Sequence, residues 1–278
     1  MKVIALIGYR NWAFQIFKNL IKYNKDIKFI LISQIDQKKN KNIPKNWTSY
    51  FIDPKNNNNM YKILNKNKVS AALFYGWSWI IKNEIIQNNL CICLHPSKLP
   101  KYRGGSPIQH QIINGERFSA VTLFKMDKTI DGGDIYAQKQ FSLNGTISEI
   151  FKRIEKIGFK ISNNLINDIK NNSIKFKKQK NKSKVYKRRN KSESEIKISS
   201  FKKMSYIYFN NFVRMLDDPY PNAFFKIKEK KIIIKKIKKM KTKHFNKILF
   251  DFNNISIKKG VYIKLKDSII KVTKMKIV

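Results

Sequence analysis

Residues 1–32, MKVIALIGYRNWAFQIFKNLIKYNKDIKFILI, decide the fold of this chain. They hold an apolar run at Val3–Ile7, a helix-like stretch at Trp12–Tyr23 and a second apolar run at Ile27–Ile32. Apolar residues that recur every three to four positions indicate an amphipathic helix, and short unbroken apolar runs are typical of buried strands. The opening of the chain therefore predicts a strand, a helix and a second strand.

The same alternation continues beyond residue 32, with strand-like runs at Ala71–Tyr75 and Leu90–Leu94. Strands that alternate with helices form right-handed crossovers in a parallel sheet. We therefore predict an α/β fold with a doubly wound, mostly parallel sheet. Two strands joined by an Asp-Gly-Gly turn, Ala120–Met126 and Ile135–Phe141, and a long amphipathic helix over 146–170 complete this part.

The chain of 278 residues is long enough for a second, smaller domain. We predict a first domain at 1–172, a connector at 173–202 and a small β-rich domain at 203–278. The connector is rich in Lys, Asn and Ser and has no lasting apolar periodicity, which is typical of a linker. In the last domain a helix is expected first, followed by short strands, at Tyr206–Leu216, Ile232–Ile237, Lys247–Phe252, Val261–Leu265 and Ser268–Val272.

The net charge of +41 raises the question of a polyanionic partner. Phosphate-binding surfaces favour the planar arginine guanidinium, yet most of the basic residues here are lysines spread along the whole chain. The charge is therefore interpreted as a compositional bias that allows weak nucleic-acid binding without marking a dedicated site.

No apolar run reaches the length of a membrane span, and the N-terminus lacks a secretory signal. The two cysteines, Cys91 and Cys93, alternate along one predicted strand and are poorly placed to bridge each other. The histidines, cysteines and acids do not have the spacing of a metal site. We expect a reduced, cytoplasmic protein without a metal or membrane contact, for which a homodimer is compatible with the sequence.

Two residues between Leu94 and Tyr136 suggest catalysis. LHPSKLPKYRGGSPIQ places His95 just after a predicted strand, and MDKTIDGGDIY places Asp131 in a tight turn. Ligands of parallel sheets bind beyond the carboxyl ends of the strands, which is where His95 falls. An imidazole can accept a proton near neutral pH while a carboxylate stabilises the resulting cation, so the pair predicts general-base chemistry.

The pattern H-x-S-x-L-P-x-Y-x-G followed by I-D-x-G-D resembles the folate-dependent formyltransferase superfamily. That superfamily includes glycinamide ribonucleotide formyltransferase, methionyl-tRNA formyltransferases and the sugar N-formyltransferases. The resemblance extends more weakly over 1–170 and, through YKRRNKSESEI and RMLDDPYPNAFF, into the C-terminal part. It implies a Rossmann-like formyltransferase domain that moves a formyl group from 10-formyltetrahydrofolate to a primary amine through a tetrahedral intermediate.

By this resemblance His95 is the general base, and Asp131 holds the imidazole and helps to protonate the leaving nitrogen. The family's third catalytic residue is an asparagine, but Cys93 stands at that position. One oxyanion donor can contribute roughly 3–4 kcal/mol, and a thiol is only a weak donor. Three interpretations stay open: other groups stabilise the oxyanion, the enzyme is impaired, or the thiol takes part in a different chemistry.

The resemblance also implies binding residues around this pair. Side chains expected near the folate are Trp77, Trp79, Ile81, Met126 and Asp127. Side chains expected near the acceptor are Arg10, Tyr102 and Arg103.

The identity of the acceptor amine divides the members of this superfamily. The segment DPYPNAFF and the small C-terminal module favour a nucleotide-linked amino sugar as the substrate. A methionyl-tRNA formyltransferase is the first alternative, because those enzymes carry a C-terminal barrel that helps to hold tRNA and the basic charge would suit it. A catalytically impaired, polyanion-binding relative is the second.

Overall fold

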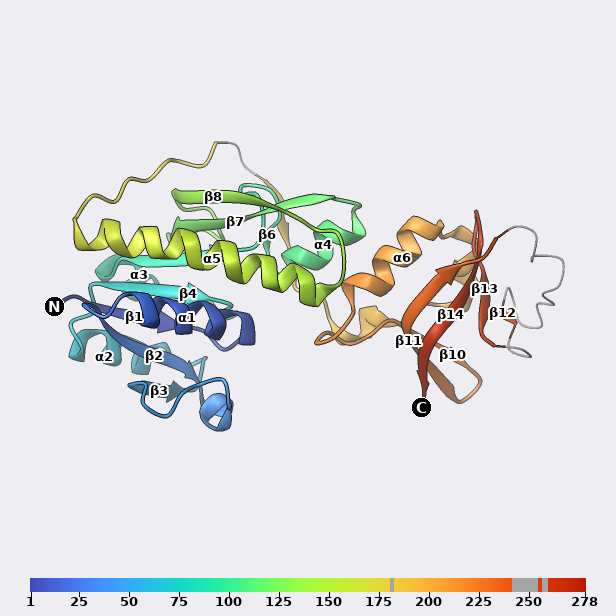
Figure 1. Cartoon of the computed structure of the whole chain (residues 1–278), viewed down its shortest axis with the longest axis horizontal. Coiled ribbons are helices and arrows are strands. Elements are labelled where there is room, and N and C mark those ends of the chain that lie inside the picture. Colours follow the sequence, from blue (N-terminus) through green and yellow to red (C-terminus); the bar gives the residue numbers. More distant parts are fainter. Residues whose placement is uncertain (181–182, 242–254, 257–259) are drawn as a thin grey trace. The chain divides into compact units, whose positions relative to one another are not determined.

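The computed structural model describes residues 1–180, 183–241, 255–256 and 260–278 (Figure 1). The chain divides into two compact units. The first comprises 1–107, 118–142 and 150–187, and the second comprises 108–117, 143–149 and 188–278. The change from the first unit to the second after Lys187 therefore falls inside the predicted connector.

The first unit is built on a seven-stranded sheet with the order β3-β2-β1-β4-β5-β7-β8. Its first five strands run parallel, and β7 and β8 are antiparallel additions at one edge. This confirms the predicted doubly wound, mostly parallel α/β fold. The strands are β1 (Val3–Ile7), β2 (Lys28–Gln34), β3 (Ser49–Ile52), β4 (Ala71–Tyr75), β5 (Cys91–His95), β7 (Phe118–Lys125) and β8 (Ile135–Ser142).

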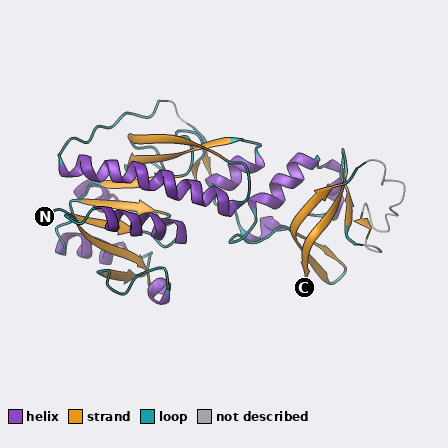
Figure 2. Cartoon of the chain, viewed as in Figure 1, coloured by secondary structure: helices purple, strands orange, loops and turns teal. Residues whose placement is uncertain are grey.

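The central strands are unbroken apolar runs because helices cover both faces of the sheet (Figure 2). On one face Phe17 stacks on Tyr75 with ring centroids 5.5 Å apart. On the other face Met60, Leu64 and Ile85 pack into one buried cluster with alternate strand residues. The helices of the chain up to residue 170 are α1 (Asn11–Tyr23), η1 (Ile35–Lys39), α2 (Asn57–Lys66), α3 (Asn83–Asn88), α4 (Pro107–Ile113) and α5 (Ile147–Lys170).

The second unit contains an antiparallel sheet with the order β10-β11-β14-β13-β12, which confirms the β-rich C-terminal domain. Its core includes Phe201, Phe209 and Phe225, whose rings meet edge to face. The predicted strand Lys247–Phe252 lies outside the described residues. The elements are η2 (Lys191–Ser194), η3 (Ile198–Lys203), α6 (Tyr206–Met215), β10 (Phe224–Ile227), β11 (Lys230–Lys239), β12 (Ile255–Ser256), β13 (Tyr262–Lys264) and β14 (Ile269–Ile277).

The described part of the predicted connector pairs with the first unit at two places. Lys177 bridges to Ile135 at the start of β8. Further on, β9 (Val185–Tyr186) pairs in parallel with β6 (Arg103–Gly104). The connector is therefore tied to the loops that follow β5 and β7. Among the described helices none is long and apolar enough to cross a membrane.

Candidate active site

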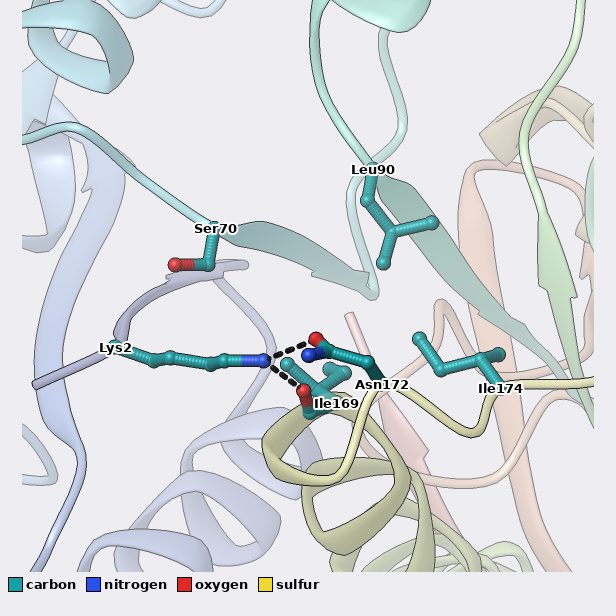
Figure 3. A pocket seen from close by; sticks show the side chains of 6 residues that line it. All are labelled: Lys2, Ser70, Leu90, Ile169, Asn172 and Ile174. Carbon is teal, nitrogen blue, oxygen red and sulfur yellow. Dashed lines mark hydrogen bonds between the residues drawn. The ribbon is translucent and has the colours of Figure 1, made fainter.

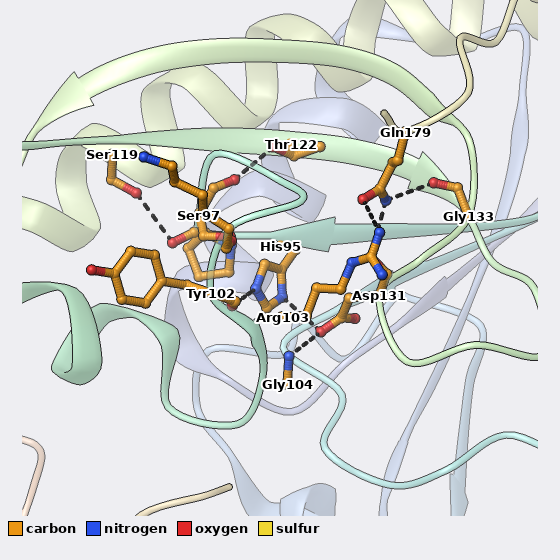
Figure 4. Close-up of polar contacts among 12 residues, drawn as sticks. His95, Ser97, Tyr102, Arg103, Gly104, Ser119, Thr122, Asp131, Gly133 and Gln179 are labelled. Atoms are coloured by element: carbon orange, nitrogen blue, oxygen red, sulfur yellow. Dashed lines mark hydrogen bonds and ion pairs between the residues drawn. The ribbon is translucent and has the colours of Figure 1, made fainter. Parts of the chain in front are cut away.

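His95 is the last residue of β5, and its side chain is buried. Its Nε2 atom lies 2.8 Å from the carbonyl oxygen of Tyr102. A carbonyl can only accept a hydrogen bond, so this geometry assigns a proton to Nε2. The other ring nitrogen, Nδ1, faces Asp131 Oδ2 at 3.4 Å (Figure 4). The structure thus brings together the two residues that the sequence singled out.

Asp131 sits in the Asp-Gly-Gly turn with a backbone φ of +49°, a left-handed conformation that aspartate and asparagine tolerate better than most residues. Its Oδ2 atom also accepts a hydrogen bond of 2.7 Å from the backbone N–H of Gly104. Gly133 is required in the same turn, because a Cβ there would overlap the carbonyl oxygen of Lys125. The turn therefore aims one carboxylate oxygen at the imidazole.

The loop after β5 is fixed by hydrogen bonds to its own backbone. Ser97 Oγ donates to the carbonyl of Lys101 at 2.6 Å, and Thr122 Oγ1 donates to the carbonyl of Ser97 at 2.6 Å. Gln138 Nε2 reaches both the carbonyl of Leu99 and Thr122 Oγ1. These contacts hold the Tyr102 carbonyl in place against His95.

Two predicted acceptor residues, Tyr102 and Arg103, belong to this loop. The Tyr102 ring stacks on Tyr186 with centroids 5.1 Å apart. Arg103 Nη2 donates to Gln179 Oε1 at 2.6 Å. Tyr186 and Gln179 come from the connector, where polar composition without periodicity gave no signal of a role. Contact of Tyr102 and Arg103 with an acceptor stays a prediction.

A sequence model of the formyl transferase family matches residues 8–165, which is more than half of the chain and includes both His95 and Asp131. The chain belongs to the formyl transferase family. It is therefore an enzyme that transfers formyl groups, and 10-formyltetrahydrofolate is the formyl donor.

Relatives of this formyl transferase carry different names. The methionyl-tRNA formyltransferase of Finegoldia magna is 27% identical over 291 residues, which cover 99% of this chain and 91% of that protein. The structure of methionyl-tRNA formyltransferase from Clostridium thermocellum matches with a TM-score of 0.65 and 28% identity, over 87% of this chain and 94% of that one. A 4-N formyltransferase from Francisella tularensis shares the fold, with a TM-score of 0.70 and 22% identity over 82% of this chain and 93% of that one.

Cys93 lies two residues before His95 on β5, so the two side chains point to the same face of the sheet. Burial raises the pKa of the Cys93 thiol well above its ordinary value, and the negative charges of Asp131 and of a Cys91 thiolate act in the same direction. A raised pKa keeps the thiol protonated at neutral pH. Because the nucleophilic form of cysteine is the thiolate, this state disfavours a reactive role for Cys93. Both cysteines are free.

Replacing Cys93 by asparagine tests whether the site lacks an oxyanion donor. We expect Cys93→Asn to raise kcat several-fold, because an amide N–H is a far better donor than a neutral thiol. Steady-state kinetics with saturating folate donor measure the change, and Cys91→Ser on the same strand is the matched control. A large loss of kcat in Cys93→Asn alone would assign the thiol a function instead.

The aromatic residues predicted near the folate gather where strand order reverses between β1 and β4, the place where parallel sheets bind ligands. The Trp79 ring lies 5.1 Å from Tyr9 and 5.3 Å from Trp77. Arg10, predicted near the acceptor, places its guanidinium carbon 4.5 Å above the Tyr9 ring. The buried indole N–H of Trp77 has no hydrogen-bond partner within the described residues. This donor group suits a polar edge of a bound ring.

The remaining predicted folate residues have different surroundings. Ile81 is 5% exposed and belongs to the buried cluster under α2 and α3. Met126 packs partly buried against that cluster. Asp127 is exposed, and its Oδ1 atom accepts hydrogen bonds from the backbone N–H and hydroxyl of Thr129. Asp127 therefore shapes the loop before the catalytic turn, and folate contacts for all three stay predictions.

A cavity of about 310 Å³ lies at the amino ends of the strands, away from His95, beside the residues that precede β1, β4 and β5 (Figure 3). Its lysine, Lys2, donates to the carbonyl of Ile169 at the end of α5 and to Asn172 Oδ1. A cation at a helix C-terminus is a stabilising arrangement, so Lys2 has a structural partner there. Within the described ranges no cluster of three His, Cys, Asp or Glu side chains could hold a metal ion.

Proposed function

We propose that this formyl transferase uses the methionyl group of charged tRNA as its acceptor. The observation that carries the proposal is the 27% identity to the Finegoldia magna methionyl-tRNA formyltransferase across 99% of this chain, which includes the C-terminal unit. The likeness to the Clostridium thermocellum enzyme, at 28% identity, supports it. Likeness to the Francisella tularensis enzyme is likeness of fold, at 22% identity.

The segment DPYPNAFF, which favoured an amino sugar, has a packing role that is independent of the acceptor. Ala223 and Phe225 are fully buried in the C-terminal unit. Asn222 Nδ2 donates to the carbonyl of Leu216 at 2.9 Å. These contacts give three residues of the segment a structural role that does not require a sugar. The preference for a nucleotide-linked amino sugar is therefore replaced by methionyl-tRNA and becomes the competing outcome of the test.

In the proposed reaction the amine attacks the formyl carbon, and the bond from that carbon to the folate nitrogen breaks. His95 and Asp131 act as one unit. Nε2 of His95 donates to the Tyr102 carbonyl and Nδ1 faces Asp131, so the general-base role expected of His95 passes in this proposal to the carboxylate that the imidazole faces. Asp131 uses Oδ2 for His95 and Gly104, so Oδ1 is available to take the amine proton and pass it to the leaving nitrogen.

An acceptor panel tests the proposal. Tetrahydrofolate release is followed with purified protein, 10-formyltetrahydrofolate and either charged initiator tRNA or 3-amino and 4-amino nucleotide sugars. We expect turnover with methionyl-tRNA and none with the sugars. Turnover with a sugar alone would restore the amino-sugar interpretation, and no turnover with any amine would favour an impaired polyanion binder.

Paired lysines on the C-terminal sheet supply a surface for tRNA phosphates. Lys236 lies directly opposite Lys274, and Lys238 lies opposite Lys271. Like charges across an antiparallel pair destabilise each other, and an anion bound over them removes that repulsion. We infer that this lysine ladder contacts the tRNA backbone.

The double variant Lys236→Gln/Lys274→Gln is expected to raise the KM for methionyl-tRNA about tenfold with kcat unchanged. For the variant, the slope of log affinity against log salt concentration should be smaller in magnitude by roughly one for each phosphate that it no longer binds. Steady-state kinetics measure the first effect, and filter binding over a salt series measures the second. Lys62→Gln, which changes an exposed lysine on α2, is the matched control. An equal effect in that variant would mean that tRNA responds to net positive charge and not to the lysine ladder.

A further inference from the structure

Gln179 joins the two loops that carry the catalytic contacts (Figure 4). Its Nε2 atom donates to the carbonyl of Asp131 at 3.0 Å and to the carbonyl of Gly133 at 2.7 Å. Its Oε1 atom accepts from Arg103 Nη2 at 2.6 Å. All three polar functions of one amide are therefore used. The residue comes from a segment whose composition predicted only a linker.

The segment that carries Gln179 is anchored on both sides of it. Before it, Lys177 exchanges two backbone hydrogen bonds of 2.8 Å with Ile135. After it, β9 pairs with β6, and the backbone N–H of Gly105 donates to the carbonyl of Tyr186 at 2.8 Å. A Cβ at Gly104 would overlap that Tyr186 carbonyl, so β9 lies as close to the loop as a backbone can. Gln179 therefore lies two residues after Lys177, a position that is held to the start of β8.

The catalytic turn needs such support because Asp131 holds a positive φ, which persists only where the surroundings enforce it. Gln179 holds the carbonyls of Asp131 and Gly133, at the strained residue and two residues after it. Through Arg103 it also holds the loop whose neighbouring residues contact His95 and Asp131. One side chain therefore fixes the relative positions of both catalytic residues.

We propose that Gln179 is a positioning residue that sets the geometry of the His95–Asp131 pair through the Asp-Gly-Gly turn. It acts through backbone carbonyls and does not contact the imidazole. The inference rests on the catalytic pair assigned under the proposed function, but it is independent of which amine is the acceptor.

Two substitutions separate the contacts of Gln179. Gln179→Leu removes all of its hydrogen bonds while keeping most of its volume. Gln179→Glu keeps an oxygen for Arg103 but removes the N–H donors and sets a carboxylate oxygen against two carbonyls. Lys180→Ala, an exposed neighbour, controls for changes in the segment. Lys2→Met removes two hydrogen bonds at the amino ends of the strands, away from the catalytic pair, and controls for reduced stability.

We expect both Gln179 variants to lower kcat by roughly 10- to 100-fold, since a misplacement of about 1 Å costs that order of rate. The KM for donor and acceptor should change by less than about twofold, because Gln179 binds neither. The pH profile of kcat should shift. A second readout needs no acceptor: the nitrogen NMR shifts of the His95 imidazole, assigned by their loss in His95→Ala, should move in both Gln179 variants and stay fixed in both controls.

Three results would overturn the inference. One is kcat and His95 NMR shifts in Gln179→Leu that match the parent protein. Another is full activity in Gln179→Glu, which would mean that the hydrogen bonds to the Asp131 and Gly133 carbonyls are not needed and that only the Arg103 contact matters. The third is an equal fall in kcat for Lys2→Met, which would mean that the loss of activity reflects reduced stability of the protein. If His95→Ala itself stays active, the catalytic pair fails, and that failure is distinguishable because it does not involve Gln179.

Discussion

Replacing His95 by alanine should lower kcat by about 10²- to 10⁴-fold, the range over which positioned acid–base groups contribute. The imidazole is buried, donates to the Tyr102 carbonyl and faces Asp131, so its removal takes away the partner of the catalytic carboxylate and leaves the Tyr102 carbonyl without its donor. Tetrahydrofolate release in a single turnover measures the loss directly. The fold should persist, because the surrounding loop is held by contacts that do not involve His95.

The control for His95→Ala is Lys98→Ala, an exposed residue of the same loop. Its kcat should equal that of the parent protein, and thermal unfolding should show one transition for both variants. Retention of even a tenth of the parent rate in a folded His95→Ala protein would remove the imidazole from the mechanism.

Asp131→Asn should lower kcat by roughly 100- to 1,000-fold while leaving the structure of the turn in place. Asparagine tolerates the left-handed φ of +49°, and its side-chain oxygen can still accept from the Gly104 N–H. The substitution therefore removes the negative charge that faces the imidazole and the oxygen that carries the proton, and little else. Pre-steady-state kinetics at several pH values measure the chemical step.

A matched substitution for Asp131→Asn is Asp53→Asn, an exposed carboxylate whose oxygen accepts from the backbone N–H of Lys55. It should leave kcat unchanged. If Asp131→Asn also keeps its rate, the proton must pass through another group and the mechanism proposed for the carboxylate is wrong.

The central strands could be predicted from sequence because burial on both faces demands unbroken apolar runs. Val3–Ile7 and Ala71–Tyr75 match β1 and β4, and Leu90–Leu94 differs from β5 by one residue. β3, at Ser49–Ile52, was missed because it is a short edge strand with mostly half-buried residues. Apolar sequence patterns identify strands whose faces are buried, but they do not identify short edge strands.

The predicted alternation implies a helix before Ala71, but the bounds of helix α2 could not be placed from the sequence, for a different reason. Its sequence, NNNMYKILNK, is rich in asparagine, which disfavours helix interiors. Met60 and Leu64, four residues apart, nevertheless bury one face against the sheet, and Asn56 caps the first turn by accepting from Asn59 N–H. Tertiary packing outweighs propensity here.

For the candidate site, sequence placed His95 and Asp131 but not the contacts that arrange them. Those contacts depend on residues far apart in the chain, such as Gln179 with Arg103 and with the Asp131 carbonyl. A polar segment without periodicity carries no local signal of such a partner. The segment becomes informative only once the fold brings it against the catalytic turn.

The most direct test of the proposed function is the chemical identity of the product. Purified protein is incubated with 10-formyltetrahydrofolate carrying a labelled formyl group and with methionyl-tRNA, and the amino acid is then released and analysed by mass spectrometry. We expect labelled N-formylmethionine in amounts equal to the tetrahydrofolate formed, and at least about 100-fold less of it in the same time with the His95→Ala variant. Unmodified methionine with the parent protein, while an amino sugar in a parallel reaction is formylated, would contradict the assigned acceptor.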